Sequence, residues 1–380
     1  MGNLPKVSVA FSNGNLLQNI PAIDGYAALM GTGLTPANIN KVFTVNSLLD
    51  AETQGITAVL EPVAHKHIAE FYTELAGNQK LYVLLTDEAV TMAQMLDANS
   101  ISFANKIMMA SNGDASIIGV FRTPPVAYAA GADFFDTDVQ AALVAAKPLV
   151  KALNDKLMFT RILIAGRVAV ETSTVIFAPK TLENDFAGVV LGDTVVGKNA
   201  CVGVALGRKQ AYACNIKVGK VANGALNVNS IFIGTKPLAT VTNLDDLHGK
   251  GVISFLTYPN KAGFFFGIDN MANTRDYRLL VYGCTIDACA KVAASVYIDE
   301  LEAEVDTNAD GTILEIDAVH LEDRIKQQVA VTIGDRISGF DALVDRTINI
   351  INTGKTAIKL RARPKGYNTF IDIDLGLTGG

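Results

Sequence analysis

The amino-acid sequence predicts an α/β fold joined to a second domain of α+β type. The chain has 380 residues, more than twice the ~150 residues of a usual domain. Up to about residue 167, short apolar β-type runs alternate with segments whose apolar residues recur every three to four positions, which is typical of a mostly parallel sheet with intervening helices. The pattern changes near residue 251. We therefore predict a separate N-terminal strand segment over 1–24, an α/β domain over 25–250 and a C-terminal α+β domain over 251–380.

The strands of the α/β domain are predicted from its apolar runs, and its helices from apolar residues that recur every three to four positions. Its predicted strands are residues 26–30, 81–85, 116–121 and 161–165. Its predicted helices are residues 63–77, 87–96, 101–111 and 138–156. Adjacent prolines in residues 123–135 predict a loop. In the C-terminal domain we predict a long helix from 274 to about 305, a strand at 312–317, a helix near 319–329 and a strand-rich tail.

The beginning of the chain looks like a detached strand. Val7, Val9 and Phe11 alternate with small residues, and the sequence SNGN then breaks the pattern. Because a lone strand is not stable by itself, this segment must pair with another strand.

The end of the chain holds two alternating segments, TAIKLRAR and TFIDIDL, separated by PKGYN. An antiparallel register that places Arg363 opposite Phe370 also places Arg361 opposite Asp372 and Lys359 opposite Asp374. Two pairings satisfy this register. The simpler one is a hairpin within one chain, and the other is a last strand that pairs with a neighbouring chain.

The amino-acid composition limits the classes of function that are open to this protein. Only 18% of the residues are charged and 49% are hydrophobic, against a typical charged share of ~25%, so either the core is large or neighbouring chains cover much of the surface. A net charge of −6 argues against general nucleic-acid binding. No uninterrupted apolar segment approaches the ~18 residues of a membrane span, so we expect no membrane contact. The four cysteines form no CxxC pair, and free thiols are expected.

Two motifs offer alternatives. Residues from Gly192 to Lys198 read GxxxxGK, but Asn199 stands where a phosphate-binding loop has Ser or Thr. A nucleotide-binding protein or enzyme that uses this loop is the alternative function. Residues from Asp306 to Asp317 match much of a calcium loop, yet the same residue types make an ordinary turn, and we assign no calcium site there. With no other catalytic signature, we predict no catalytic, cofactor-binding or metal-binding residue.

Five segments carry a resemblance to a known family by their order and spacing. They are HIAEFYTELAGNQKLYVLLTDEAVTMAQMLD, ANKIMMASNGDASIIGVFRTP, ACVGVALGRKQAYACNIKVGKVANGALNV, PNKAGFFFGIDNMANTRDYRLLVYGCTIDACAKVAASVY and LRARPKGYNTFIDIDL. Together they resemble the tail sheath proteins of contractile phage tails and related injection systems, with the nearest likeness to a Mu-like and Bacteroidetes-type subfamily. The segment GCTIDACAKVA departs from the Arg and Lys residues that are usual there.

The resemblance implies a structural protein and not an enzyme, without a cofactor. It implies stacked hexameric rings around an inner tail tube protein, baseplate and terminator proteins as further partners, and contraction that drives the tube through a target envelope. The protein would be located in the tail sheath of a virion or injection particle that is assembled in the bacterial cytoplasm. Residues 1–24 would form an N-terminal strand arm, residues 25–250 the outward-facing α/β domain, and residues 251–380 the sheath assembly domain, which ends in a second strand arm. The expected intersubunit strand residues are Val7, Val9, Phe11, Ile371, Ile373 and Leu375.

Overall fold

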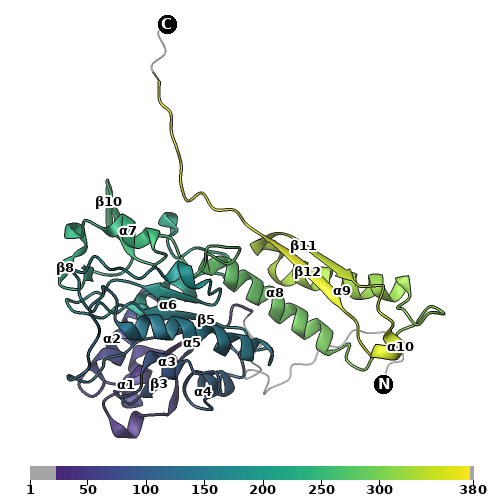
Figure 1. The fold of residues 1–380 in the computed structure, drawn as a ribbon, viewed down its shortest axis with the longest axis horizontal. Helices are drawn as coiled ribbons and strands as arrows, with labels where there is room; N and C mark the ends of the chain where they lie inside the picture. The colour runs from purple at the N-terminus through teal and green to yellow at the C-terminus, as the bar shows by residue number, and fades with distance from the viewer. Residues whose placement is uncertain (1–22, 377–380) are drawn as a thin grey trace, which may run out of the picture.

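The computed structural model describes residues 23–376, which form a large α/β body and a narrower layer of helices and strands beside it (Figure 1). The body is built on a six-stranded sheet of order β2-β3-β1-β4-β5-β6, in which β2 is antiparallel and the other strands are parallel. The strands are β1 Tyr26–Thr32, β2 Val42–Val45, β3 Leu81–Thr86, β4 Ala115–Val120, β5 Arg161–Ala165 and β6 Ala187–Val190. The predicted α/β fold class is confirmed.

All four predicted strands are present as β1, β3, β4 and β5. They were recognisable because parallel strands that are buried on both faces read as continuous apolar runs. Strands β2 and β6 were missed. Each has four residues, too short for a period to emerge, and Gly188 interrupts the apolar run of β6.

Helices form two layers against the sheet. Their bounds are α1 Leu48–Thr53, α2 Pro62–Leu75, α3 Met92–Met95, α4 Phe103–Ala110, α5 Thr137–Asn154 and α6 Val202–Gln210. Helix α2 packs on α6, and α3 packs on α5. The chain moves outward from β1 to β3 and then back across the sheet to β4 and β5. Since crossovers are right-handed, this reversal places the two layers on opposite faces.

The contact between α2 and α6 depends on two glycines. A Cβ atom on Gly203 would lie 2.2 Å from the carbonyl oxygen of His67, and one on Gly207 would lie 2.5 Å from that of Phe71. The spacing of four residues on both helices brings the two backbones into direct contact over one turn. Larger residues at these positions would push the helices apart.

The remaining part of the body consists of short elements. They are β7 Phe232–Ile233, β8 Lys236–Pro237, α7 Leu244–Gly249, β9 Phe255–Tyr258 and β10 Lys261–Phe266. Among the described residues, 3₁₀ turns cover Pro36–Asn38, Pro179–Leu182, Val221–Asn223 and Leu238–Thr240 in the body, and Gly334–Arg336 in the narrower layer. Apolar residues of β9 and β10 join the core of the body, which runs from Ala27 to Leu280.

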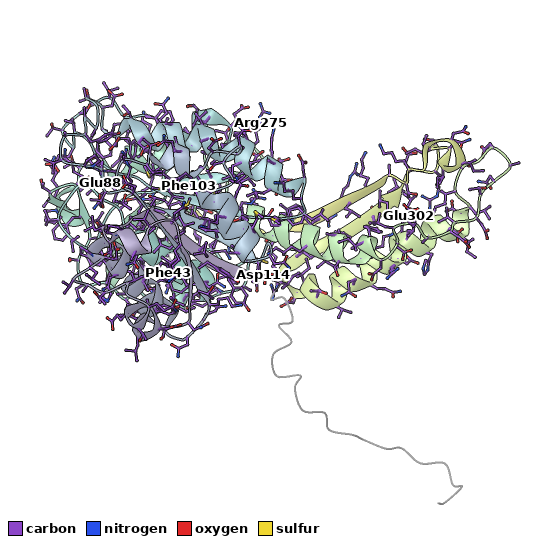
Figure 2. The ribbon with its side chains drawn as sticks, turned by 90° about the horizontal axis from the view of Figure 1, so that it is seen from below. Phe43, Glu88, Phe103, Asp114, Arg275 and Glu302 are labelled. Atoms are coloured by element: carbon purple, nitrogen blue, oxygen red, sulfur yellow. The ribbon has the colours of Figure 1, made fainter. Side chains whose placement is uncertain are left out.

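The narrower layer contains α8 Leu280–Ile298, α9 Glu315–Ile333, β11 Ile337–Val344, α10 Ile350–Thr353 and β12 Ile358–Pro364. Figure 2 views this layer from a perpendicular direction, with Glu302 toward its far end. The layer has smaller cores of its own, whose central residues include Val292, Ile325 and Val329. Leu280 is the last residue in the core of the body, and Cys284 packs against both that core and a small core of the layer. The division of the chain at residue 250 stays a prediction.

Two sequence predictions for this layer need correction. The long helix is shorter at both ends than 274–305. The strand predicted at 312–317 is wrong, because α9 already begins at Glu315. Inward-facing Ala318, Leu321 and Ile325 carry a helical period, and acidic residues in the first turn favour a helix N-terminus.

Helix α8 links the layer to the body. Arg161, the first residue of β5, donates two hydrogen bonds of 2.6 Å to the carboxylate of Asp287 on α8. By length and composition α8 could also cross a membrane, with a mean hydropathy of 1.2. Half of that stretch is buried inside the protein, which is typical of a core helix.

Candidate assembly site

Strands β11 and β12 form an antiparallel ribbon that lies over the helix pair. Phe340 pairs with Ala362, and Asp341 pairs with Arg361. Strand β11 packs on α9, and β12 packs on α8. Ile358, Leu360 and Ala362 turn toward the small cores beneath them. The ribbon therefore has one apolar face, as the period of two in this segment predicts.

The opposite face of β12 is basic. Lys359, Arg361 and Arg363 are exposed, and no ion pair to any of them occurs among residues 23–376. The facing residues of β11 include Asp341, whose carboxylate lies 3.7 Å from Lys326 on α9. The three charges of β12 thus remain available to an acidic strand.

The ribbon is narrow for the helices it covers. Two packed helices lie ~8–10 Å apart and each is ~10 Å wide, so the layer is about 20 Å across, whereas two strands at ~4.8 Å spacing cover about 10 Å. Within residues 23–376 no further strand pairs with either outer edge of this ribbon. The helix pair therefore has room for about two more strands.

Helix α8 also retains uncovered apolar surface. Ile286, Ala290 and Ala294 are only partly buried, and Ile298, the next residue at the same spacing, is 52% exposed. A helix that is apolar on all sides is ordinarily buried on all sides. Residues 23–376 bury only part of α8.

The chain leaves the ribbon after Pro364 as an extended arm without assigned strand structure (Figure 1). Ile371, Ile373 and Leu375 are 73%, 83% and 92% exposed, and they alternate with Asp372 and Asp374. We call residues 365–376 the C-terminal arm. It presents apolar side chains on one side and carboxylates on the other, with nothing in the described chain covering them.

The hairpin predicted within one chain is wrong. Strand β12 pairs with β11 and not with residues 369–375. The hydroxyl of Tyr367 donates a 2.6 Å hydrogen bond to the carbonyl oxygen of Asn215, which draws the chain toward the body and away from the edge of β12. The competing partner β11 has the same alternation, so the local pattern could not distinguish them. The second pairing, with a neighbouring chain, stays a prediction.

The N-terminal strand residues Val7, Val9 and Phe11 lie outside the described residues. The described chain begins at Ile23, which packs against the small core of the helix pair. Asp24 follows, and its carboxylate accepts hydrogen bonds from Arg336 at 2.5 Å and from the backbone N–H of Cys214 at 3.1 Å. Sequence reasoning missed these contacts, because no periodic pattern marks a residue that is held by a distant loop.

The alternative phosphate-loop reading finds little support in the geometry. After β6 the chain from Gly192 runs alongside other loops, and Asp193 and Gly197 make bridges to Phe232 and Gly234. The buried carboxylate of Asp193 pairs with Lys66 and accepts the N–H of Thr194 at 2.7 Å. A negative group in this position repels phosphate.

The calcium-like loop is a self-contained turn. Asp317 accepts the backbone N–H of Asp306 at 2.7 Å, and Asp310 accepts both the N–H and the hydroxyl of Thr312. The side-chain NH₂ group of Asn308 donates hydrogen bonds to Thr312 and Ile313. A calcium ion would require an oxygen ligand there instead of an N–H donor. Among the described residues no group of three or more metal-ligating side chains comes together.

Comparisons with known proteins agree with this architecture. The family model described as DUF2586, N-terminal domain, matches residues 4–270. No curated protein matches the sequence. The contracted helical sheath of the anti-feeding prophage is 12% identical, with 99% of each chain covered and a TM-score of 0.64.

Two further sheath structures are similar. The contracted PVC sheath complex of an extracellular contractile injection system is 12% identical over 99% of this chain and 98% of that chain, with a TM-score of 0.56. The sheath tail protein of Desulfitobacterium hafniense is 10% identical over 95% of this chain and 100% of that chain, with a TM-score of 0.51. The resemblance to sheath proteins is thus confirmed in the fold, and the chain belongs to the DUF2586 family.

Proposed function

We propose that this protein is the sheath subunit of a contractile tail or injection particle. Copies would stack as hexameric rings around an inner tube and shorten to drive that tube through a target envelope, with baseplate and terminator proteins at the ends. The observation that carries the proposal is a two-stranded ribbon with uncovered edges beside an arm of matching chemistry on the same chain. The fold shared with sheath proteins supports it.

The arm of one copy fits the β12 edge of another. In an antiparallel pairing, Asp372 would face Arg361 and Asp374 would face Lys359. On the opposite side, Ile373 and Leu375 would extend the apolar face of β12 over the helix pair. Backbone hydrogen bonds supply the affinity and the alternating side chains set the register. Burying each of the large aliphatic side chains contributes about 1.5–3 kcal/mol.

Such a contact uses different surfaces on the two partners. A heterologous contact that does not close on itself produces open helical arrays, which suits a sleeve of indefinite length. The arm would keep neighbours attached while the α/β bodies move as rigid units between an extended and a contracted packing. Force would then come from a difference in packing energy, and the proposed function requires no hydrolysis site.

A charge-reversal series tests the pairing. Asp372→Lys with Asp374→Lys places like charges opposite the basic face of β12, and we expect loss of tubes in negative-stain micrographs with an unchanged melting temperature. Adding Lys359→Asp and Arg361→Asp to the same chain restores opposite charges and should restore tubes.

The matched control is Asp133→Lys with Asp155→Lys, two exposed carboxylates on the α/β body, which should leave assembly intact. Tubes formed normally by the arm variant would show that this register is wrong. A wild-type protein that stays monomeric at every concentration, alone and with its tube partner, would contradict the sheath function itself.

A further inference from the structure

One turn of the α/β body holds Asp24, the last residue of the predicted N-terminal arm, and Tyr367 of the C-terminal arm. The turn follows α6 and is closed by a hydrogen bond of 2.9 Å from the N–H of Ile216 to the carbonyl oxygen of Ala213. A turn of this kind leaves the N–H and C=O groups of its two central residues without partners in the turn. Here those central residues are Cys214 and Asn215, and both are buried.

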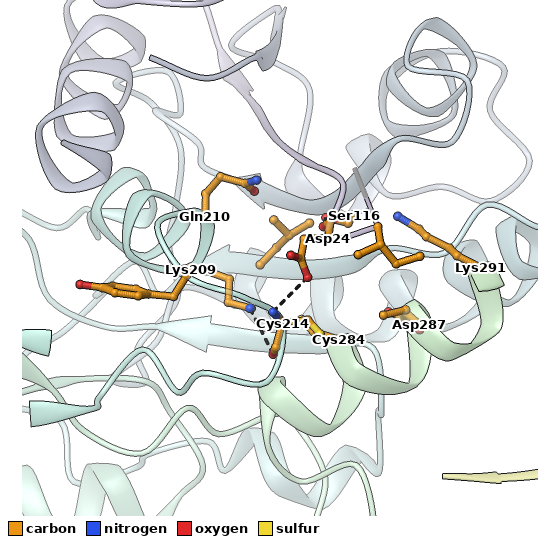
Figure 3. A pocket seen from close by; sticks show the side chains of 12 residues that line it. Asp24, Ser116, Lys209, Gln210, Cys214, Cys284, Asp287 and Lys291 are labelled. Atoms are coloured by element: carbon orange, nitrogen blue, oxygen red, sulfur yellow. Dashed lines mark hydrogen bonds between the residues drawn. The ribbon is translucent and has the colours of Figure 1, made fainter. Parts of the chain in front are cut away.

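The N-terminal arm uses the first of these residues. The Cys214 N–H donates to the Asp24 carboxylate, which also accepts from Arg336 beyond α9. Figure 3 shows Asp24 beside Cys214, with Lys209 reaching the same turn. The backbone oxygen of Asp24 accepts the hydroxyl of Ser116 at 2.5 Å. The root of this arm is therefore fixed to the sheet, the turn and the helix pair at once.

The C-terminal arm uses the second residue. The Asn215 carbonyl accepts the Tyr367 hydroxyl, and the Tyr367 ring lies 5.8 Å from that of Tyr282 on α8. Lys217 lies 5.6 Å from the same ring and 3.4 Å from the carboxylate of Asp269. The aromatic ring, the cation and the buried carboxylate hold the root of this arm from three directions.

We propose that the turn 213–216 couples the two arms, so that loosening the root of one arm loosens the root of the other. Adjacent residues of a four-residue turn cannot move independently, because one hydrogen bond closes both into the same ring. In the assembled sheath this would make the directions of the two arms change together. That consequence rests on the proposed function, whereas the coupling is a property of the single protomer.

Hydrogen exchange on the dilute full-length chain tests the coupling. Tyr367→Phe removes only the hydroxyl that binds Asn215, and Tyr367→Ala also removes the ring. We expect exchange in the peptide over 211–217 to rise about 3- to 10-fold, which corresponds to the loss of one hydrogen bond. We expect the peptide over 24–30, which Tyr367 does not touch, to follow it. Phe370→Ala, on an exposed side chain of the same arm, should change neither peptide.

A double-mutant cycle in urea gives the second readout. Asp24→Asn and Tyr367→Phe remove contacts on adjacent turn residues, and their combined effect on the unfolding equilibrium should depart at least about 3-fold from the product of the single effects. The control cycle pairs Asp24→Asn with Tyr72→Phe, whose hydroxyl also binds backbone carbonyls, of Val45 and Gln79, and should be additive.

Unchanged exchange over 24–30 in both Tyr367 variants, or additivity in the first cycle, would overturn the proposal. Neither readout depends on tube formation, so failure of the coupling and failure of the sheath function are separable. A protein that never assembles could still show coupled arm roots, and an assembling protein could show independent ones.

Discussion

Replacement of Asp287 by asparagine should strongly destabilise the protein, because it breaks the ion pair that joins α8 to the central sheet. The Arg161 side chain is 3% exposed and that of Asp287 is 9% exposed. Burial alone would lower the pKa of Arg161, but the Asp287 carboxylate reverses this and raises it. In the variant a guanidinium would stay buried without its counter-charge.

The expected cost can be bounded from the contacts that remain. Removing one partner of a buried pair costs about 3–5 kcal/mol. Arg161 would keep the carbonyl oxygens of Asp185 at 2.8 Å and Gly283 at 3.2 Å, so we expect the lower end of that range. A loss of about 3 kcal/mol is a factor of roughly 150 in the unfolding equilibrium constant.

Urea unfolding at neutral pH measures this difference through the shift of the midpoint at constant slope. Asp246→Asn is the control, since its exposed pair with Lys250 spans 3.6 Å and such pairs contribute well under about 1 kcal/mol. Arg161→Met with Asp287→Leu removes both charges and should recover most of the lost stability. A loss below about 1 kcal/mol in Asp287→Asn, or a double variant less stable than the single one, would refute the reasoning.

Two further predictions concern the α/β body. Gly203→Ala should cost about 1–3 kcal/mol in chemical unfolding, because the new methyl group meets the backbone of α2; Gly249→Ala, which meets open space, should cost nothing, and equal effects at both sites would contradict the close-packing argument. Burial raises the pKa of Glu70, but hydrogen bonds and charges from His67 and Lys66 outweigh it and lower the pKa to about 2. A carboxyl whose pKa is lowered by folding adds stability above its unfolded pKa of ~4.3, and this is lost as the pH falls toward about 2. Between pH ~4.3 and about 2, the unfolding free energy should therefore change less with pH in Glu70→Gln than in the wild type. Equal pH dependence in the two proteins would contradict the lowered pKa of Glu70.

Local periods predicted much of the α/β body. Strand β5 begins and ends at the predicted residues 161 and 165, since a strand buried on both faces is one apolar run between polar boundaries. Helix α5 is likewise close to its prediction despite Pro148 within it. By contrast, the six residues 312–317 are too few to distinguish a strand from the start of a helix by periodicity. There the inward-facing residues of the following helix decided the outcome.

The candidate assembly site was predicted only in part. The alternation of Ile371, Ile373 and Leu375 with aspartates is visible in the sequence, and so is its match to β12. The use of Cys214 and Asn215 to hold Asp24 and Tyr367 is not, because a backbone group in a turn carries no side-chain signal. Such contacts appear only when distant segments are placed in space.

By itself the sequence determined most strands and helices of the α/β body and the apolar face of β12. That the terminal segments need a partner strand stays a prediction. Only the tertiary structure decided that β12 pairs with β11, that residues 365–376 leave the ribbon, and that one turn holds both Asp24 and Tyr367. The physical reason is the distance along the chain over which each interaction acts. Alternation and helical period act between neighbours in the chain, whereas several segments of equal period compete for one edge and packing across the whole molecule selects among them.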